Sequence, residues 1–220
     1  MLTIHHLNNS RSQRILWLLE ELGVEYHLEK YQRDAKTGLA PAEMKAVHPL
    51  GRSPVLTTDT TTLAESGAII EYIVRHHGRD SFAKPSNEQS LQQYDFWMHF
   101  SEGSLMPAKV ALMVFSKAEE KVPGLIRPMV RKLLGEIANA YYRPNLKQSL
   151  KYTESHLQNH AWFAGSEPTG ADVQMIFPLE AMVATGKATD YPAIKAYVEK
   201  VHQRPAYQRA LEKGGKYDYA

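Results

Sequence analysis

Hydrophobic and polar side chains alternate along residues 2–7 and again along residues 24–29. Alternation of this kind is typical of strands with one buried face. Between these stretches, apolar side chains at positions 15, 18, 19 and 22 share one face of a helix, and Gly23 is a suitable end for it. A strand, a helix and a second strand in this order predict two parallel strands joined by a right-handed crossover.

A hairpin and another helix complete this half of the chain. Val55–Thr57 and Thr62–Ala64 are short runs joined by polar residues, which predicts two antiparallel strands. The helix that follows carries apolar side chains at positions 69, 70, 73 and 74 and stops at Gly78. With a short helix before the hairpin, the order βαβαββα predicts an α/β domain of thioredoxin-like fold over residues 1–78.

The pattern changes after a polar, proline-bearing connection at residues 79–87. Beyond it the strand signals disappear, and residues 87–117 form one long helical pattern in which Pro107 is expected to produce a bend. Residues 88–220 are therefore predicted to form an all-α helical bundle. Its further helices are expected at residues 125–142, 145–159, 171–187, 191–203 and 206–213.

Composition narrows the classes of function. The hydrophobic fraction of 43% and the charged fraction of 23% are ordinary for a soluble globular protein. The net charge is +2 and the basic residues do not form a run, so no nucleic-acid partner is expected. No stretch approaches the roughly 18 apolar residues of a membrane span, and no leader pattern precedes the first strand. We therefore expect a cytoplasmic protein that does not contact a membrane.

The chain contains no cysteine, which excludes disulfides, thiolate metal sites and a protein thiol as nucleophile. Its histidine pairs, at positions 5–6 and 76–77, are adjacent in sequence. Helical metal sites instead need ligands about one turn apart. We therefore expect no metal site.

The most informative residues for chemistry lie at positions 52–56 and 65–66. Pro54 opens a predicted strand without donating a ladder hydrogen bond, and the Ser53–Pro54 bond is a candidate for a cis peptide. An extended backbone at this point can pair with a peptide-like ligand. Glu65 and Ser66 add a carboxylate, a hydroxyl and the first amides of a helix. Together these groups predict a site for a small zwitterionic peptide.

Four motifs together resemble the cytosolic glutathione transferase family, and the likeness covers essentially the whole chain. They are Asn-Ser-Arg-Ser-Gln-Arg at residues 9–14, the proline-containing run at residues 48–56, Glu-Ser-Gly-Ala-Ile at residues 65–69, and Thr-Gly-Ala-Asp at residues 169–172. The last resembles a capping box, in which Thr169 and Asp172 satisfy amides at a helix start. The first strand ends without a tyrosine, so the chain is most similar to serine-type members of bacterial and fungal kind.

This resemblance implies an enzyme that uses glutathione as co-substrate, without a metal. The implied reaction is conjugation of the glutathione thiolate to small hydrophobic electrophiles, with glutathione-dependent peroxidase activity as a further activity and detoxification as the role. It also implies a homodimer that pairs through the long helix near Tyr94 and the third helix near Tyr72. The alternative is a non-catalytic relative that uses the same fold to bind partners or apolar ligands.

Ser10 is the residue expected to act on the thiol. It lies between the first strand and the first helix, where the helix N-terminus favours an anion. A free thiol has a pKa of about 8.5, and lowering it by one or two units stabilises the thiolate by about 1.4 to 2.7 kcal/mol. Asn9 and Arg11 are alternative donors to the thiolate. Ser10 could also serve only as a helix cap.

The resemblance implies contacts for each part of glutathione. Glu65 would meet the ammonium of the γ-glutamyl unit, and Ser66 with the helix amides would meet its carboxylate. The backbone of Ser53, before Pro54, would pair with the cysteinyl unit. The glycyl carboxylate would be neutralised by one or more of three basic residues, Arg52, Lys36 and His48.

An aromatic and methionine-rich series on the long helix suggests a pocket for the hydrophobic substrate. The residues assigned to it are Trp97, His99, Met106 and Met113. Series of this kind more often form a core or a dimer interface, and that alternative stays open.

Overall fold

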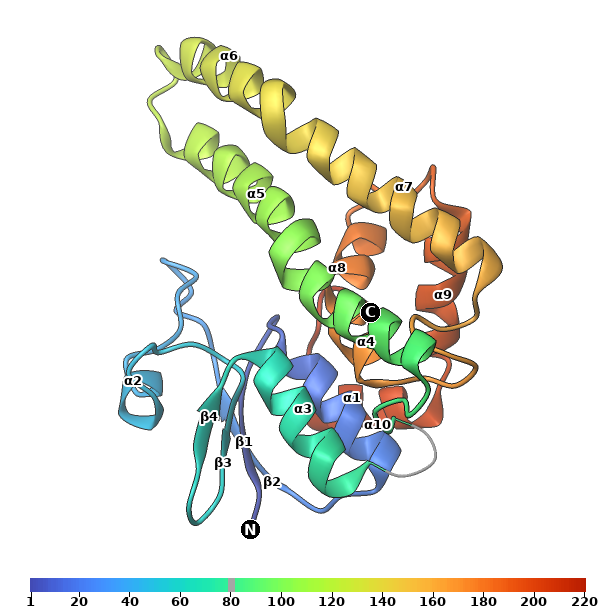
Figure 1. Cartoon of the computed structure of the whole chain (residues 1–220). Helices are drawn as coiled ribbons and strands as arrows, with labels where there is room; N and C mark the ends of the chain where they lie inside the picture. The colour runs from blue at the N-terminus through green and yellow to red at the C-terminus, as the bar shows by residue number, and fades with distance from the viewer. Residues whose placement is uncertain (79–81) are drawn as a thin grey trace.

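The computed structural model describes residues 1–78 and 82–220. The first three residues of the expected connection at residues 79–87 therefore lie outside the described residues. Figure 1 shows a domain built on a sheet beside a domain built of helices. The expected fold class, a thioredoxin-like α/β domain followed by a helical domain, is confirmed.

The sheet has the strand order β2-β1-β3-β4. The inner strand β1 (Thr3–Leu7) pairs in parallel with β2 (His27–Tyr31) and antiparallel with β3 (Val55–Thr57), which pairs with β4 (Thr62–Ala64). β2 begins later than the alternation at residues 24–29 predicts, because those first residues bring the chain back from the end of the preceding helix. The carbonyl ends of β1 and β2 point the same way, as the crossover requires.

The crossover helix α1 (Ser12–Leu22) lies at the junction of the two domains. Its side chains are buried from Ser12 to Glu20, because one face packs on the sheet and the other contacts α8 (Gly170–Ala184) and α10 (Pro205–Gly214). A helix buried on all sides fixes the position of the loop that precedes it. The loop between β1 and α1 is therefore a well-supported place for a functional group.

The remaining helix of the sheet domain that touches the core is α3 (Ser66–His77). Ile69, Ile70 and Ile73 on this helix are fully buried in the core that the two domains share. Each buried side chain of this size contributes about 1.5–3 kcal/mol. The short helix α2 (Met44–Val47) is anchored separately, where Met44 packs with Leu7 and Val55.

The helical domain is dominated by two long antiparallel helical runs that project beyond the body of the molecule (Figure 1). The first run comprises α4 (Glu88–Phe100), the π-helical turn η1 (Ser101–Leu105) and α5 (Met106–Lys121). The second comprises α6 (Arg127–Ile137), the π-helical turn η2 (Ala138–Tyr142) and α7 (Arg143–Asn159). The remaining helices are α8, α9 (Pro192–His202) and α10.

Both π-helical turns have the same local cause. In each, the amide that follows the turn donates to a carbonyl five residues earlier, from Met106 to Ser101 and from Arg143 to Ala138. Pro107 and Pro144 follow directly, and a proline ring clashes with the carbonyl four residues before it. Widening the preceding turn relieves this clash. Separate helices were expected at residues 125–142 and 145–159, but the second run continues across Pro144 with only a widened turn.

The central helix α8 begins with the predicted capping box. The Thr169 hydroxyl accepts a hydrogen bond from Ala171 N at 3.2 Å, and the Asp172 carboxylate accepts one from Thr169 N at 2.8 Å. Pro178 lies inside this helix and is buried. In the described ranges 1–78 and 82–220, no helix combines the length and apolar character needed to cross a bilayer.

Candidate functional site

A cleft of about 1020 Å³ opens between the sheet domain and the first long helical run. The sheet domain contributes the loop before β3 and the start of α3, and the helical domain contributes α4, η1, α5 and one residue of α8. Five of the predicted glutathione-binding residues line the cleft on the side of the sheet domain, namely Arg52, Ser53, Pro54, Glu65 and Ser66. Residues far apart in sequence are thus brought to one surface.

The loop before β3 is fixed to the inner strand. The Ser53–Pro54 peptide bond is cis, as the sequence predicted. The Ser53 hydroxyl donates to His5 O at 2.9 Å and accepts from Leu7 N at 3.2 Å. Pro54 is buried, while Arg52 beside it is exposed on the cleft wall. The loop therefore presents a fixed backbone and an exposed cation to a ligand.

Glu65 and Ser66 lie where β4 gives way to α3. Glu65 is exposed, and its backbone has a φ of +70°, a conformation that costs energy for a residue with a side chain. Strain of this kind persists where the surrounding structure holds it, often at a binding site. The first amides of α3, at Ser66 and Gly67, face the same cleft and have no partner within the helix. The start of α3 is therefore suited to bind a carboxylate.

Ser10 lies in the loop between β1 and α1 and is 5% exposed. Its Oγ atom is 2.8 Å from Ser12 Oγ, 3.4 Å from Ser53 Oγ, and accepts from Ser12 N at 3.2 Å. Ser12 Oγ in turn lies 2.8 Å from His6 Nδ1. Three hydroxyls and an imidazole thus form a connected chain beneath the cleft. Of this chain, only Ser53 is part of the cleft lining as the structure describes it.

The histidine at the end of this chain is kept neutral. Burial, assisted by the charge of Lys30, lowers the pKa of His6 to about 4. Near neutral pH its Nδ1 atom can therefore accept a hydrogen bond from the Ser12 hydroxyl. When Ser12 donates to His6, its oxygen can accept a hydrogen bond from the Ser10 hydroxyl. The Ser10 hydroxyl can instead donate to another acceptor.

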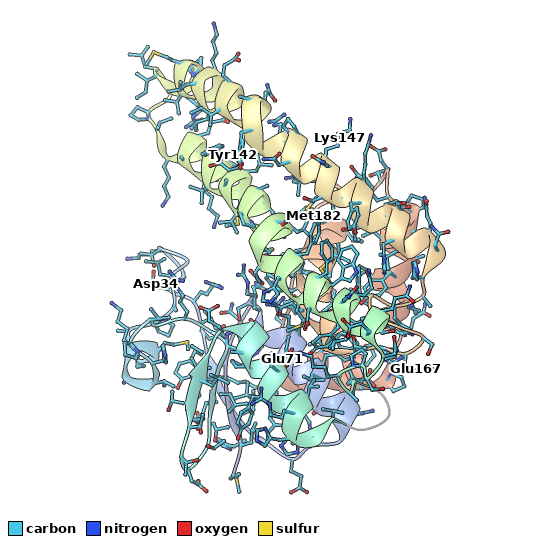
Figure 2. The ribbon with its side chains drawn as sticks, in the orientation of Figure 1. Asp34, Glu71, Tyr142, Lys147, Glu167 and Met182 are labelled. Carbon is cyan, nitrogen blue, oxygen red and sulfur yellow. The ribbon has the colours of Figure 1, made fainter. Side chains whose placement is uncertain are left out.

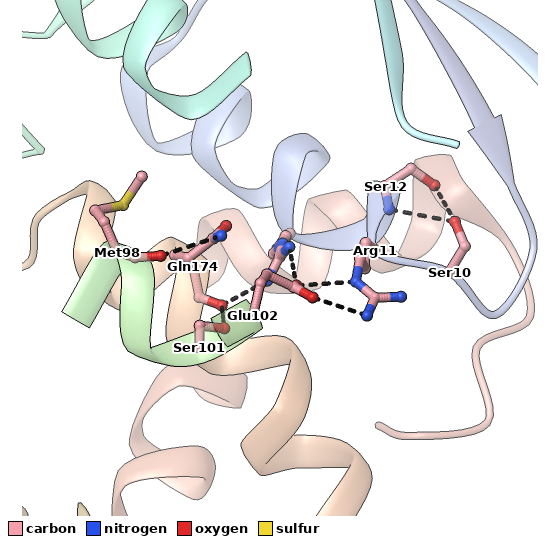
Figure 3. Close-up of polar contacts among 8 residues, drawn as sticks. Ser10, Arg11, Ser12, Met98, Ser101, Glu102 and Gln174 are labelled. Atoms are coloured by element: carbon pink, nitrogen blue, oxygen red, sulfur yellow. Dashed lines mark hydrogen bonds and ion pairs between the residues drawn. The ribbon is translucent and has the colours of Figure 1, made fainter. Parts of the chain in front are cut away.

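Arg11 follows Ser10 and lines the cleft. Its Nε and Nη2 atoms each lie 2.9 Å from an oxygen of Glu102 on η1 (Figure 3). Glu102 also lines the cleft, so this pair joins the two domains across its floor. A bidentate pair of this geometry fixes the plane of the guanidinium group. The widened turn before Pro107 carries Glu102, whose carboxylate holds the Arg11 guanidinium.

A second arginine makes this junction rigid. Arg14 is almost completely buried and donates from Nη2 to Glu102 Oε1 at 2.8 Å and from Nη1 to Gln174 O at 2.5 Å. Burial raises the pKa of the Glu102 carboxyl, but the hydrogen bonds from Arg11 and the charges of both arginines outweigh it and hold that pKa at about 2. Glu102 is therefore ionised throughout the neutral range.

The other predicted glutathione residues are not brought to the cleft. Lys36 is exposed in the loop after β2, and His48 is half-buried, with its Nδ1 atom 3.3 Å from Leu50 N. Neither is part of the cleft lining, whereas Arg52 is. Of the three predicted basic residues, Arg52 is thus the one that lines the cleft.

The residues assigned to the hydrophobic pocket lie in four different surroundings. His99 is on the cleft wall. Trp97 is fully buried in the core, with its Nε1 atom donating to Gln93 Oε1 at 3.1 Å. Met106 is buried against Phe177 and Tyr217, and Met113 is half-exposed farther along α5. Trp97 is therefore a core residue, which was the alternative to a pocket residue in the sequence analysis.

The sequence did not identify all residues of the cleft. Val110 and Gln174 line it, although they carried no recognisable motif. Glu102 had no spacing signal either, but Pro107 five residues later could have indicated the widened turn on which it lies. Within the described ranges, no group of three or more histidine and acidic side chains is arranged to hold a metal ion.

Comparison with known proteins identifies the family. Residues 10–76 match the family described as "Glutathione S-transferase, N-terminal domain", and residues 122–205 match "Glutathione S-transferase, C-terminal domain". "Glutathione S-transferase 3" of Schizosaccharomyces pombe is 41% identical, over 97% of this chain and 88% of that protein. "Glutathione S-transferase 1" of Saccharomyces cerevisiae is 32% identical, over 97% of this chain and 95% of that protein.

Solved structures of glutathione S-transferases share the fold of this chain. A glutathione S-transferase from Actinobacillus pleuropneumoniae superposes with a TM-score of 0.84 at 32% identity, covering 100% of this chain and 95% of that one. A sphingomonad glutathione S-transferase solved in complex with glutathione has a TM-score of 0.74 at 24% identity, covering 97% and 98%, and shares the fold. The expected family and enzyme class are confirmed: this chain belongs to the glutathione S-transferase family.

Proposed function

We propose that this protein conjugates the thiolate of glutathione to small hydrophobic electrophiles. The observation that carries the proposal is the meeting of three groups at one cleft. These are the fixed Ser53–Pro54 backbone, the strained Glu65 with the free amides of α3, and the loop that begins α1. Each suits a different part of a zwitterionic tripeptide with a central thiol.

Recognition of glutathione follows from the charges around the cleft. Glu65 would pair with the γ-glutamyl ammonium, while the hydroxyl of Ser66 and the first amides of α3 would donate hydrogen bonds to the neighbouring carboxylate. The backbone of Ser53 is placed to pair with the cysteinyl unit. Arg52, exposed on the same wall, is placed to neutralise the glycyl carboxylate.

Activation of the thiol is assigned to the start of α1. The Ser10 hydroxyl would donate to the sulfur, while the N-terminus of α1 and the Arg11 guanidinium favour its negative charge. Together these groups are asked to lower the thiol pKa by one to two units from about 8.5. The nucleophile then belongs to glutathione, and the protein supplies ionisation and position.

The alternative of a non-catalytic relative is less well supported. A scaffold that only binds protein partners has no need of a strained acidic residue beside unpaired helix amides. We further propose a cytoplasmic detoxifying role.

We also propose that the protein is a homodimer. Exposed apolar side chains lie along α4 and α5, namely Phe96, Met113 and Val114. Tyr94, near which pairing was expected, is itself buried in the core, so the contact would use the outer face of α4. Sedimentation equilibrium should give twice the mass of one chain, and a monomer at micromolar concentration would contradict the proposal.

Steady-state conjugation of chlorodinitrobenzene tests the proposed function, with calorimetry of glutathione binding in parallel. We expect saturable, glutathione-dependent turnover and binding in the micromolar to low millimolar range. A Glu65→Ala, Ser66→Ala double variant should lose binding of glutathione, since it removes both charged and hydroxyl contacts. Absence of glutathione binding by the folded parent protein would overturn the proposal in favour of a non-catalytic role.

A further inference from the structure

Residues 215–220, which follow α10, return to the junction of the two domains, and the proposed reaction does not use them. Tyr217 is buried and packs on Met106 of α5 and Phe177 of α8. The ring of Tyr219 also meets Phe177, with the two centroids 6.0 Å apart. These aromatic side chains attach the segment to the helical domain.

A buried carboxylate fixes the segment further. Glu180 on α8 is 1% exposed, and its Oε1 atom accepts a hydrogen bond from the Tyr217 hydroxyl. Its Oε2 atom accepts from the Tyr207 hydroxyl at 2.6 Å and lies 3.3 Å from His202 Nε2. Burial and the charge of Glu180 raise the pKa of the Tyr217 hydroxyl, so that this group remains a donor at neutral pH. The backbone that leads into residue 218 is therefore held by the helical domain.

Asp218 reaches from this anchor to the sheet domain, where it holds Asn9. Its backbone amide donates to Asn9 Oδ1 at 2.9 Å, and its Oδ2 atom accepts from Asn9 Nδ2 at 2.6 Å. Figure 3 shows the segment, in faint red, passing beside the loop that carries Ser10 and Arg11. Because both ends of the Asn9 amide are bound, its orientation is fixed, and the carboxylate makes one of the two bonds charge-assisted.

Asn9 directly precedes Ser10 and has an uncommon backbone conformation. Its φ is +50°, in the left-handed region that asparagine tolerates better than most residues. On the backbone, Arg33 Nη2 donates to Asn9 O at 3.3 Å. Arg33 belongs to the loop after β2, which Asp34 marks in Figure 2. The residue that sets the direction of the chain into Ser10 is therefore held by one group from each domain.

Neither Asn9 nor Asp218 is part of the cleft lining as the structure describes it. The pair can therefore act on glutathione only through the loop that it holds. Ser10 is 5% exposed, so the direction in which the loop presents its hydroxyl decides whether that hydroxyl meets a bound sulfur. A displacement of about 1 Å at such a group is enough to weaken catalysis severely.

We propose that Asp218 is a positioning residue for thiol activation and that it acts through Asn9. By holding the Asn9 amide, it keeps the left-handed turn before Ser10 and directs the Ser10 hydroxyl toward the sulfur. The inference rests on the proposed function, because it requires glutathione in the cleft and Ser10 as the donor to its thiolate.

The proposal predicts a sign that charge alone would not give. A carboxylate near a thiol raises the thiol pKa, so removal of its charge by itself lowers that pKa. Loss of the hydrogen bond from a misdirected Ser10 raises it instead. A rise in Asp218→Ala together with no rise in Asp218→Asn is therefore specific to positioning, because asparagine keeps an oxygen that can accept from Asn9.

Titration of the thiolate absorbance of bound glutathione tests the proposal. Asp218→Ala should raise the thiol pKa by about half a unit and lower kcat at pH 6.5 by about threefold, since the thiolate fraction falls by that factor. Affinity for glutathione should stay within about twofold, because Arg52, Glu65 and Ser66 are untouched. Asp218→Asn, and the control Glu212→Ala at an exposed acid of α10, should titrate within about 0.2 unit of the parent complex.

A double-mutant cycle shows whether the effect passes through Asn9. Asn9→Gly tolerates the same φ but removes both hydrogen bonds, so it should raise the thiol pKa at least as much as Asp218→Ala. In the Asn9→Gly background, Asp218→Ala should have no further effect. An unchanged thiol pKa in Asp218→Ala, an equal rise in Asp218→Asn, or additive effects in the cycle would overturn this inference alone. Bound glutathione that titrates like free glutathione in the parent protein would overturn the proposed function as well.

Discussion

Arg11 and Glu102 are joined by two hydrogen bonds of 2.9 Å, although one residue begins the first helix of the sheet domain and the other lies on a widened turn of the helical domain. The cation that follows the proposed thiol donor Ser10 in the sequence is thus held by a carboxylate from the other domain. Because Arg14 donates to the same carboxylate from a buried position, any change at Glu102 affects both the cleft and the domain junction.

Replacing Glu102 should therefore destabilise the fold in a pH-dependent way. Its pKa is lowered from 4.5 to about 2 in the folded protein, so its stabilising effect is complete above about pH 4.5 and is lost as the pH falls toward 2. We expect Glu102→Gln to lower the free energy of unfolding by about 2 kcal/mol at pH 7, less than for a fully buried pair because the carboxylate is partly exposed.

Urea unfolding at several pH values measures this effect. Glu119→Gln is a suitable control, because it breaks the more exposed pair with Arg131 and should cost about 0.5 kcal/mol or less. Equal losses for the two variants, or a loss at Glu102 that persists unchanged at pH 2, would contradict this view of the domain junction.

His6 should also make the stability of the fold depend on pH, and its contribution is again lost as the pH falls. Its pKa is lowered from 6.5 to about 4, so the folded state favours the neutral ring, and the stability this contributes is lost as the pH falls from 6.5 through 4. Protonation would also turn Nδ1 into a donor and reverse its hydrogen bond with Ser12. His6→Asn, which cannot titrate here, should flatten the stability profile between pH 6.5 and 4. A profile identical to the parent's would exclude His6 as its cause.

Glu65 should govern affinity for glutathione without affecting the fold. Glu65→Gln keeps the size of the side chain but removes its charge, so KM for glutathione should rise about tenfold with kcat little changed. Lys36→Gln is the control, since Lys36 is exposed outside the cleft lining and its loss should leave KM within about twofold. A larger effect at Lys36 than at Glu65 would reverse the assignment of the cleft wall.

Asp172 is expected to serve stability and not chemistry. Its carboxylate accepts hydrogen bonds from Thr169 N, Phe163 N and the Tyr197 hydroxyl at 2.8, 3.0 and 3.1 Å. Asp172→Ala leaves these donors buried and unpaired, which should cost about 3–4 kcal/mol, whereas Asp190→Ala on the surface should cost about 0.5 kcal/mol or less. Thermal unfolding decides this, and a normal melting temperature for Asp172→Ala would show that the capping box is dispensable.

Local sequence signals predicted those parts of the fold that local chemistry determines. The Gly23 helix end, the cis bond before Pro54 and the capping box at Thr169 each depend on a few neighbouring residues, and the structure shows all three. The widened turns before Pro107 and Pro144 were not predicted, because a proline can end, bend or widen a helix and the sequence pattern alone does not distinguish these outcomes.

The site was predictable on the sheet side and less so on the helical side. Motifs identified Glu65 and Ser66 because a strand-to-helix junction leaves amides unpaired wherever it occurs. Gln174 and Met98 reach the cleft only through the crossing of α8 and α4, and that crossing is set by tertiary packing. The same packing buries Trp97, which helical spacing alone could not distinguish from a residue of the cleft wall.

The central claim is that the protein lowers the pKa of the glutathione thiol. The ultraviolet absorbance of the thiolate in the complex can be titrated directly. We predict that bound glutathione ionises one to two units below the value of about 8.5 for the free thiol, and that Ser10→Ala raises this pKa by about one unit while Ser104→Ala, at an exposed serine on η1, leaves it unchanged. A bound thiol that titrates like the free one, or a Ser10→Ala complex that titrates like the parent complex, would contradict the account.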